Sequence, residues 1–176
     1  MKTITLSLDR ALIIQAVKDD TFITGQIDKS ADAVKNAQLA FNEQAGDEEH
    51  HERKMLRTLR TAVSKFEANM MEFVDSSNGS IDDTLANTTA ENTAFVITIN
   101  VSDRYSEGHA KPLSSLAYEY IVNQMLYAWW QSVKPALAKD YLTFSQDSLM
   151  RIRLCLAKSA PTAANADYTD ITGTVS

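Results

Sequence analysis

The segment from Leu113 to Lys134 constrains the fold of this chain more than any other. It reads LSSLAYEYIVNQMLYAWWQSVK, and its apolar residues recur at the three- and four-residue steps of an α-helix. They form two stripes on opposite sides of that helix. One stripe contains Leu113, Leu116, Ala117, Tyr120, Ile121 and Tyr127, and the other contains Tyr118, Val122, Met125 and Trp129. A helix that is apolar on both sides must be covered on both sides, by its own chain or by neighbouring subunits.

Length and composition indicate one globular domain. The chain has 176 residues, of which 44% are hydrophobic and 23% charged, and this length suffices to bury a core. The net charge of −6 weighs against a dedicated nucleic-acid binder but leaves room for a local basic patch. We expect no signal peptide in residues 1–10 and no membrane span, because no segment reaches roughly 18 uncharged apolar residues.

Two stretches alternate between apolar and polar residues, which predicts strands. Ile4, Leu6 and Leu8 alternate with Thr and Ser and indicate a short strand or an extended arm. Residues 94–102 alternate more strongly and form the best strand of the chain. Because a lone strand is not stable, its partner must be residues 81–86, the N-terminal arm or a strand of another subunit.

The remaining segments read as helices. Asp9 is a suitable N-cap for a first helix, which we expect to be interrupted at residues 19–21 and at Gly25. An Ala-rich helix is predicted over about 30–44. Pro112 is expected just before the central helix, Pro135 ends or kinks it, and a last helix covers about 137–158. The inward side chains of this last helix are expected to be Leu142, Leu149, Ile152 and Leu156.

The helix that follows residue 47 has the clearest pattern. Its a/d seam consists of Leu56, Leu59, Val63, Phe66, Met70 and Phe73. The opposite face carries Arg53, Lys54, Arg57, Arg60 and Lys65. Such a charged face is ordinarily solvated, and the alternative is a patch that meets an acidic neighbouring subunit.

Together these segments predict a mainly α-helical fold. It is a bundle of three to four main helices with a small β element inserted at about 76–110 and with extended terminal arms. Residues 1–160 form the single domain. Residues 161–176 form a tail with few large apolar groups, which is either disordered or ordered on a partner.

No catalytic or metal-binding constellation is evident, and no cofactor is predicted. Glu48 and His51 have the i, i+3 spacing of di-iron bundles, but no second such pair exists. Asp82 and Asp83 lie in a polar stretch where a turn role is expected. Cys155 lies among apolar residues and reads as a buried, unreactive thiol. We therefore expect that the protein is not an enzyme, and that Trp129 and Trp130 serve packing and assembly.

The order of these elements resembles the neck proteins of tailed bacteriophages. The stretches that carry the resemblance are ITLSLDRAL, FITG, VITINVS and YEYIVNQMLYAWW, within about residues 5–160. The chain is particularly similar to head–tail connector or adaptor proteins from phages and prophages of gut Bacteroidetes, crAss-like phages among them. The resemblance implies a homo-oligomeric ring of about 12 copies below the portal, which extends the DNA channel and offers a platform to the next tail component.

The resemblance also implies where the protein acts and what it contacts. It would be located in the neck of the virion, bind the portal and the next ring, and let packaged DNA pass without sequence-specific binding. The candidate partner contacts are Tyr118, Val122, Met125, Trp129, Trp130, Arg53, Arg57, Arg60, Tyr168 and Ile171. The alternatives are a tail-completion or tail-terminator protein, a small helical metal-binding protein with Glu48, His50 and His51, and a DNA-binding module that uses residues 53–65.

Overall fold

The computed structural model describes residues 2–31, 49–73, 94–101 and 110–157. Within these ranges, the side chains of residues 25–31, 94–95 and 110–111 are not described. The elements are strand β1 (Lys2–Asp9), helix α1 (Arg10–Ala31), helix α3 (Glu49–Asn69), strand β2 (Ala94–Val101), helix α4 (Ala110–Trp130) and helix α5 (Pro135–Ala157). The predicted class, a helical bundle with a small β element, is therefore confirmed.

The two strands form one antiparallel sheet. Lys2 pairs with Val101 at one end, and Asp9 pairs with Ala94 at the other. Of the three partners considered for β2, the N-terminal segment is the one that supplies the second strand. The inward residues of both strands are buried in the core, and they are Leu6, Leu8, Ile97, Ile99 and Val101.

Helix α1 begins where the sequence predicts but does not stop at residues 19–21. The Asp9 carboxylate accepts hydrogen bonds from the backbone N–H groups of Ala11 and Leu12, at 2.8 and 3.3 Å, as an N-cap does. The prediction of an interruption is wrong. The buried Thr21 donates its hydroxyl to the carbonyl of Lys18 at 2.9 Å, so its polar group is satisfied inside the helix.

The Ala-rich helix predicted over about 30–44 falls largely outside the described residues, since only residues 30 and 31 are described, as the end of α1. Within α1, Gly25 does not end the helix, because one glycine in a helix lowers its stability by only about 1 kcal/mol relative to alanine. The local signals at residues 19–21 and Gly25 therefore misplaced the end of the first helix.

The a/d seam of α3 is confirmed with one correction. Leu59, Val63, Phe66 and Met70 are buried, and Phe73 packs against the core. At the first position of the seam, Met55 is buried whereas Leu56 is only half-buried. The flexible Met side chain fits the irregular space at this end of the bundle.

Helices α4 and α5 are joined by a short turn at residues 131–134. Pro135 is the first residue of α5, where its missing N–H costs nothing. Pro112 lies within the first turn of α4 rather than before it. On α5, Leu142 and Leu149 are half-buried, whereas the small residues Ala138, Ser145 and Ser148 are buried together with Ile152 and Leu156. Small side chains in this stripe let the two helices approach closely.

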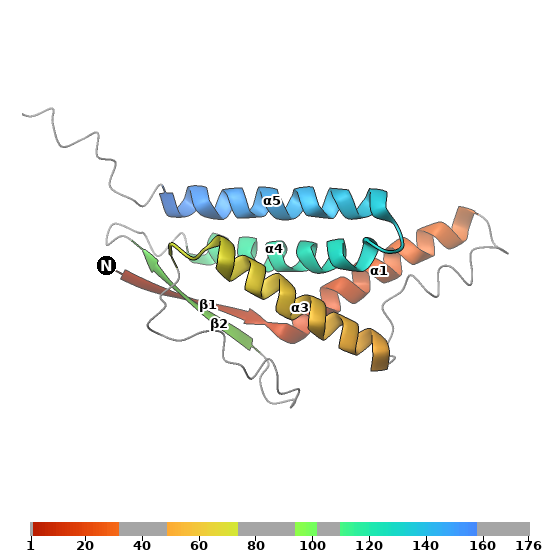
Figure 1. Ribbon diagram of the computed structural model, residues 1–176, viewed down its shortest axis with the longest axis horizontal. Helices are drawn as coiled ribbons and strands as arrows, with labels where there is room; N and C mark the ends of the chain where they lie inside the picture. The colour runs from red at the N-terminus through yellow and green to blue at the C-terminus, as the bar shows by residue number, and fades with distance from the viewer. Residues whose placement is uncertain (1, 32–48, 74–93, 102–109, 158–176) are drawn as a thin grey trace, which may run out of the picture.

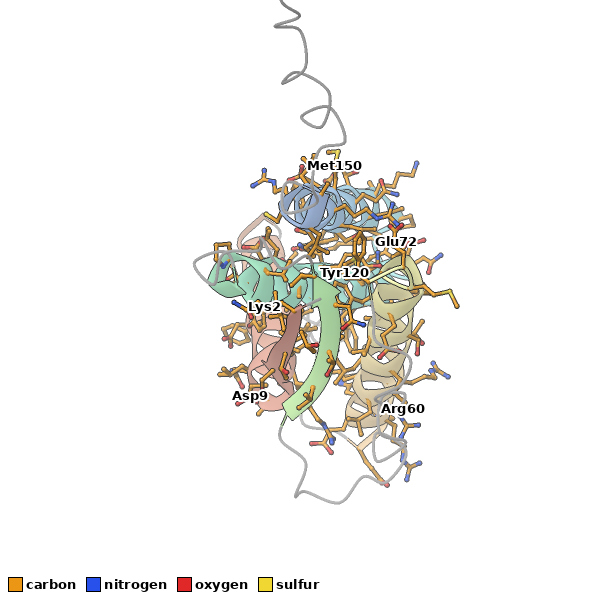
Figure 2. The ribbon with its side chains drawn as sticks, turned by 90° about the vertical axis from the view of Figure 1, so that its left-hand side faces the viewer. Lys2, Asp9, Arg60, Glu72, Tyr120 and Met150 are labelled. Atoms are coloured by element: carbon orange, nitrogen blue, oxygen red, sulfur yellow. The ribbon has the colours of Figure 1, made fainter. Side chains whose placement is uncertain are left out.

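The elements are arranged in layers around α4 (Figure 1). Helix α5 runs along one side of α4, and α1, α3 and the sheet lie on the other side (Figure 2). Helix α4 contacts α1, α3, α5 and β1, so the chain itself covers both apolar stripes. None of the helices in the described ranges combines the length and apolar character needed to cross a lipid bilayer.

Candidate interaction surfaces

Trp129 is buried beneath side chains from α3. It is 3% exposed, the Nζ atom of Lys54 lies 4.2 Å from the centre of its ring, and His51 meets it edge-on at 5.4 Å between ring centres. Burial, followed by the nearby charge of Arg57, lowers the pKa of Lys54. The cation over the indole face stabilises the contact between α3 and α4.

Trp130 is fully buried at the end of α4. The Nζ atom of Lys134 lies 5.2 Å from the centre of its ring. Its indole N–H has no hydrogen-bond partner among the described residues. This tryptophan therefore fills the core and does not present its ring to a partner in this conformation.

The other residues predicted on the second stripe of the central helix are also used by the chain itself. Val122 is 8% exposed and Met125 is 1% exposed. Tyr118 is half-buried, and its hydroxyl donates to the carbonyl of Leu12 in α1 at 3.2 Å. Of the two ways to cover this helix, coverage by its own chain is the one observed, so Val122, Met125 and both tryptophans are not accessible to a partner here.

A network of polar side chains links three helices, in which Gln124 and Ser145 are buried and Lys65 is at the surface. Lys65 in α3 donates to the side-chain oxygen of Gln124 in α4 at 3.3 Å, and the amide of Gln124 donates to the hydroxyl of Ser145 in α5 at 2.8 Å. Ser145 donates in turn to the carbonyl of Leu142 at 2.8 Å. Because the polar groups of this network bond to one another, their burial costs little free energy. The network therefore helps to fix the register of the three helices.

The basic face predicted on α3 is on the surface. Arg57 is exposed, Arg60 is half-exposed and lies at the outer side of α3 (Figure 2), and Arg53 is exposed and forms an ion pair with Glu49 one turn away. These three arginines are accessible to a partner. The candidates Tyr168 and Ile171 lie outside the described residues.

Most of the candidate metal and catalytic residues, namely Glu48, Asp82 and Asp83, lie outside the described residues. The rings of His50 and His51 lie 4.3 Å apart between their centres at the start of α3. Among the residues that are described, no group of three or more His, Cys, Asp or Glu residues could hold a metal ion. Cys155, expected to be buried, is half-buried on α5.

Two apolar surfaces were not predicted from the sequence. The α5 surface comprises Met150 and Leu154, which are 56% and 53% exposed, and the α1 surface comprises Leu12, Phe22 and Ile23, which are 61%, 52% and 55% exposed. Phe144 is also exposed, but it points about 120° away from Met150 around α5 and meets the ring of Tyr141 edge-on. Met150 lies on the side of α5 away from α4 (Figure 2), and Leu154 follows it one helical turn later. The available signal was that these residues fall outside the inward stripe expected for the last helix.

Comparison of the chain with protein-family models, with curated proteins and with solved structures gave no match. The accessible surfaces of α1, α3 and α5 therefore carry the functional inference.

Proposed function

We propose that this chain is a structural subunit of a tailed-bacteriophage neck, a head–tail adaptor that forms a ring below the portal around the DNA channel. It acts by assembly, without catalysis, and its place is the virion. The proposal joins the resemblance of four sequence stretches to one structural observation, namely the two exposed apolar surfaces on α1 and α5.

A ring needs two different contact surfaces on each subunit. In a closed ring every interface is heterologous, so one patch of a subunit meets a different patch of its neighbour. An isologous dimer needs only one self-complementary patch. The α1 surface and the α5 surface are such a pair, because they belong to two different helices that each pack against α4.

Clustering distinguishes these surfaces from scattered exposed apolar residues. Single exposed apolar side chains are normal on soluble proteins. On α5, Met150 and Leu154 stack at i, i+4. On α1, Leu12 and Ile23 lie on the same side about 16 Å apart along the helix, and Phe22 extends this side around the helix. Burial of such clusters against a neighbour supplies a hydrophobic driving force for assembly.

The test is the mass of the assembled species. The purified full-length chain is measured by mass photometry alone and after mixing with the portal protein of the same phage and with its next neck or tail component. A ring that appears with the portal supports the adaptor role. Association with the tail tube but not with the portal would instead favour the tail-completion alternative, and association with neither component contradicts both.

Surface variants test the two-patch geometry. Met150→Gln/Leu154→Gln alters the α5 surface, Leu12→Gln/Ile23→Gln alters the α1 surface, and Met71→Gln/Val133→Gln alters two exposed apolar residues elsewhere. Each surface variant is expected to prevent ring formation, whereas the control assembles. A mixture of the two surface variants retains one intact interface and is expected to form dimers only. Rings formed by either surface variant alone would contradict the geometry.

A further inference from the structure

The outer face of α3 carries cations without intervening acids. Five Lys or Arg residues occur between Arg53 and Lys65, and no Asp or Glu occurs among them. Acidic residues of the helix lie only before and after this run, at Glu49, Glu52 and Glu67. The run covers about 18 Å of helix at 1.5 Å per residue.

The lysines and arginines of this run have different surroundings. Lys54 lies over the ring of Trp129 at 4.2 Å, and Lys65 lies 5.8 Å from the ring centre of Tyr127 while donating to Gln124. Both lysines are thereby held against α4. Arg53 and Arg57 instead are exposed on successive turns, and Arg53 forms a solvent-exposed ion pair with Glu49 that a phosphate would have to displace or share.

The net charge of the whole chain hides the charge of its helical body. The described ranges contain 14 of the 17 Lys and Arg residues but only 11 of the 23 Asp and Glu residues, a difference of +3. The remaining residues contain 3 Lys or Arg and 12 Asp or Glu, a difference of −9. The charge of α3 between Arg53 and Lys65 is thus opposite in sign to the whole-chain value of −6.

We propose that the arginine face of α3, made by Arg53, Arg57 and Arg60, binds the phosphate backbone of duplex DNA without reading its sequence. The planar guanidinium fork matches phosphate oxygens in a bidentate way. Contacts of this kind position a protein on DNA and carry no base specificity. The inference does not rest on the adaptor role, since it concerns a different surface.

Charge density favours DNA over an acidic protein surface as the occupant. Duplex DNA carries one negative charge per about 1.7 Å of its axis, or about six charges along the roughly 10 Å of helix between Arg53 and Arg60. The exposed side of an acidic helix offers roughly one carboxylate per 5.4 Å turn. Three arginines within two turns of α3 are therefore matched more fully by the phosphate backbone.

Salt dependence of binding tests the proposal. Fluorescence anisotropy of a labelled 24-base-pair duplex is measured with the full-length chain between 50 and 200 mM NaCl. With three phosphate contacts, log K is expected to fall with log salt with a slope of about −2.7, which makes binding about 40-fold weaker across this range. No binding at 50 mM NaCl, or a slope near zero, overturns the proposal.

Two matched double variants locate the contact. Arg53→Gln/Arg57→Gln is expected to weaken binding at 50 mM NaCl by about tenfold and to make the slope shallower by about 2. Lys139→Gln/Arg151→Gln removes the same charge from exposed positions of α5, including an arginine paired one turn away with Asp147. It is expected to change the slope by less than about 0.5.

Controls distinguish a DNA site on α3 from misfolding, from general charge attraction and from binding of an acidic protein. Circular dichroism of both variants must match the parent, which excludes misfolding as the cause of lost binding. Equal losses in the two variants would show general charge attraction and contradict a site on α3. Tighter binding to polyglutamate competitor than to duplex would assign the face to an acidic protein and overturn the DNA proposal. Ring formation is measured separately, so failure here leaves the adaptor proposal standing.

Discussion

The side-chain amide of Gln124 in α4 donates a hydrogen bond of 2.8 Å to the hydroxyl oxygen of Ser145 in α5, where both side chains are buried. Gln124 also accepts a hydrogen bond from Lys65 in α3. One amide therefore ties the central helix to its neighbours on both sides. Polar groups in such a position help to select one arrangement of the helices, because a shift of either helix would leave them unsatisfied.

Removal of this amide should destabilise the fold. Gln124→Ala leaves Ser145 and Lys65 without their partner and opens a small cavity, so we expect a loss of about 2–3 kcal/mol in the free energy of unfolding. Urea unfolding followed by circular dichroism measures the loss. Gln146→Ala, at an exposed position of α5, is the control and should change stability by less than about 0.5 kcal/mol. Equal effects of the two substitutions would show that the buried network does not matter.

Arg153 should stabilise the fold more than its neighbour Arg151. The guanidinium of Arg153 donates to the backbone carbonyl of Asn69 at 2.8 Å, at the C-terminal end of α3, where carbonyl groups lack helical partners. Arg153→Met is expected to cost about 0.5–1 kcal/mol. Arg151→Met breaks only an exposed pair with Asp147 and should cost less than about 0.5 kcal/mol. Thermal unfolding of both variants compares them, and the reverse order would contradict the capping role.

The N-cap of α1 should be replaceable by a residue of the same hydrogen-bonding ability. Asp9→Ala removes the acceptor for the N–H groups of Ala11 and Leu12 and is expected to cost about 1 kcal/mol. Asp9→Asn keeps an acceptor and should retain most of the stability. Both are compared by urea unfolding at one pH. A full loss in Asp9→Asn would point to charge rather than to the cap.

Asp20 should make stability depend on pH. Burial, followed by the charge of Asp19, raises the pKa of Asp20 above its ordinary value of 3.8. The folded state therefore disfavours the carboxylate, and stability falls as the pH rises through the unfolded and then the folded pKa. Asp20→Asn removes this penalty and is expected to stabilise the protein at pH 7.

The gain from Asp20→Asn should shrink below the folded pKa and vanish below about pH 3.8, where both states of the parent are protonated. The pKa values of Tyr118 and Tyr141 are raised, chiefly by burial and then by neighbouring acids that include Asp20. Both tyrosines therefore keep their protons throughout the measured pH range and do not contribute to the change in stability. Urea unfolding from pH 3 to pH 7 measures the difference. Asp140→Asn, an exposed substitution, is the control. A gain that is constant with pH would contradict the assignment to the Asp20 charge.

The helical content and the need to cover the central helix on both sides were predictable because they depend on local periodicity. The a/d seam of α3 and the alternation in β2 identify their buried sides without knowledge of any partner. The end of α1 was not predictable in this way. Asp19, Asp20 and Thr21 look like a helix stop in isolation, and only the burial of Thr21 against the bundle, with its hydroxyl satisfied, keeps the helix continuous.

The candidate site was predicted only in part. The arginines of α3 were recognised from charge, and Arg53 and Arg57 are indeed exposed. Trp129 and Trp130 were assigned to both packing and assembly, and in this structure they pack within the chain. Composition alone does not separate the apolar surfaces on α1 and α5 from the core. On α5 the periodicity had already placed Ile152 on the inward stripe and left Met150 outside it.

The sequence by itself determined that a doubly apolar central helix exists, that it needs cover on both sides, and that one strand needs a partner. Tertiary structure decided which elements cover α4 and which strand pairs with β2. Helices α5, α1 and α3 cover α4, and β1 is the partner of β2. The physical reason is that periodicity records how much apolar surface a segment must bury, which is local. The identity of the covering surface depends on contacts between residues far apart in the chain, such as Gln124 with Lys65, and these exist only once the chain has folded.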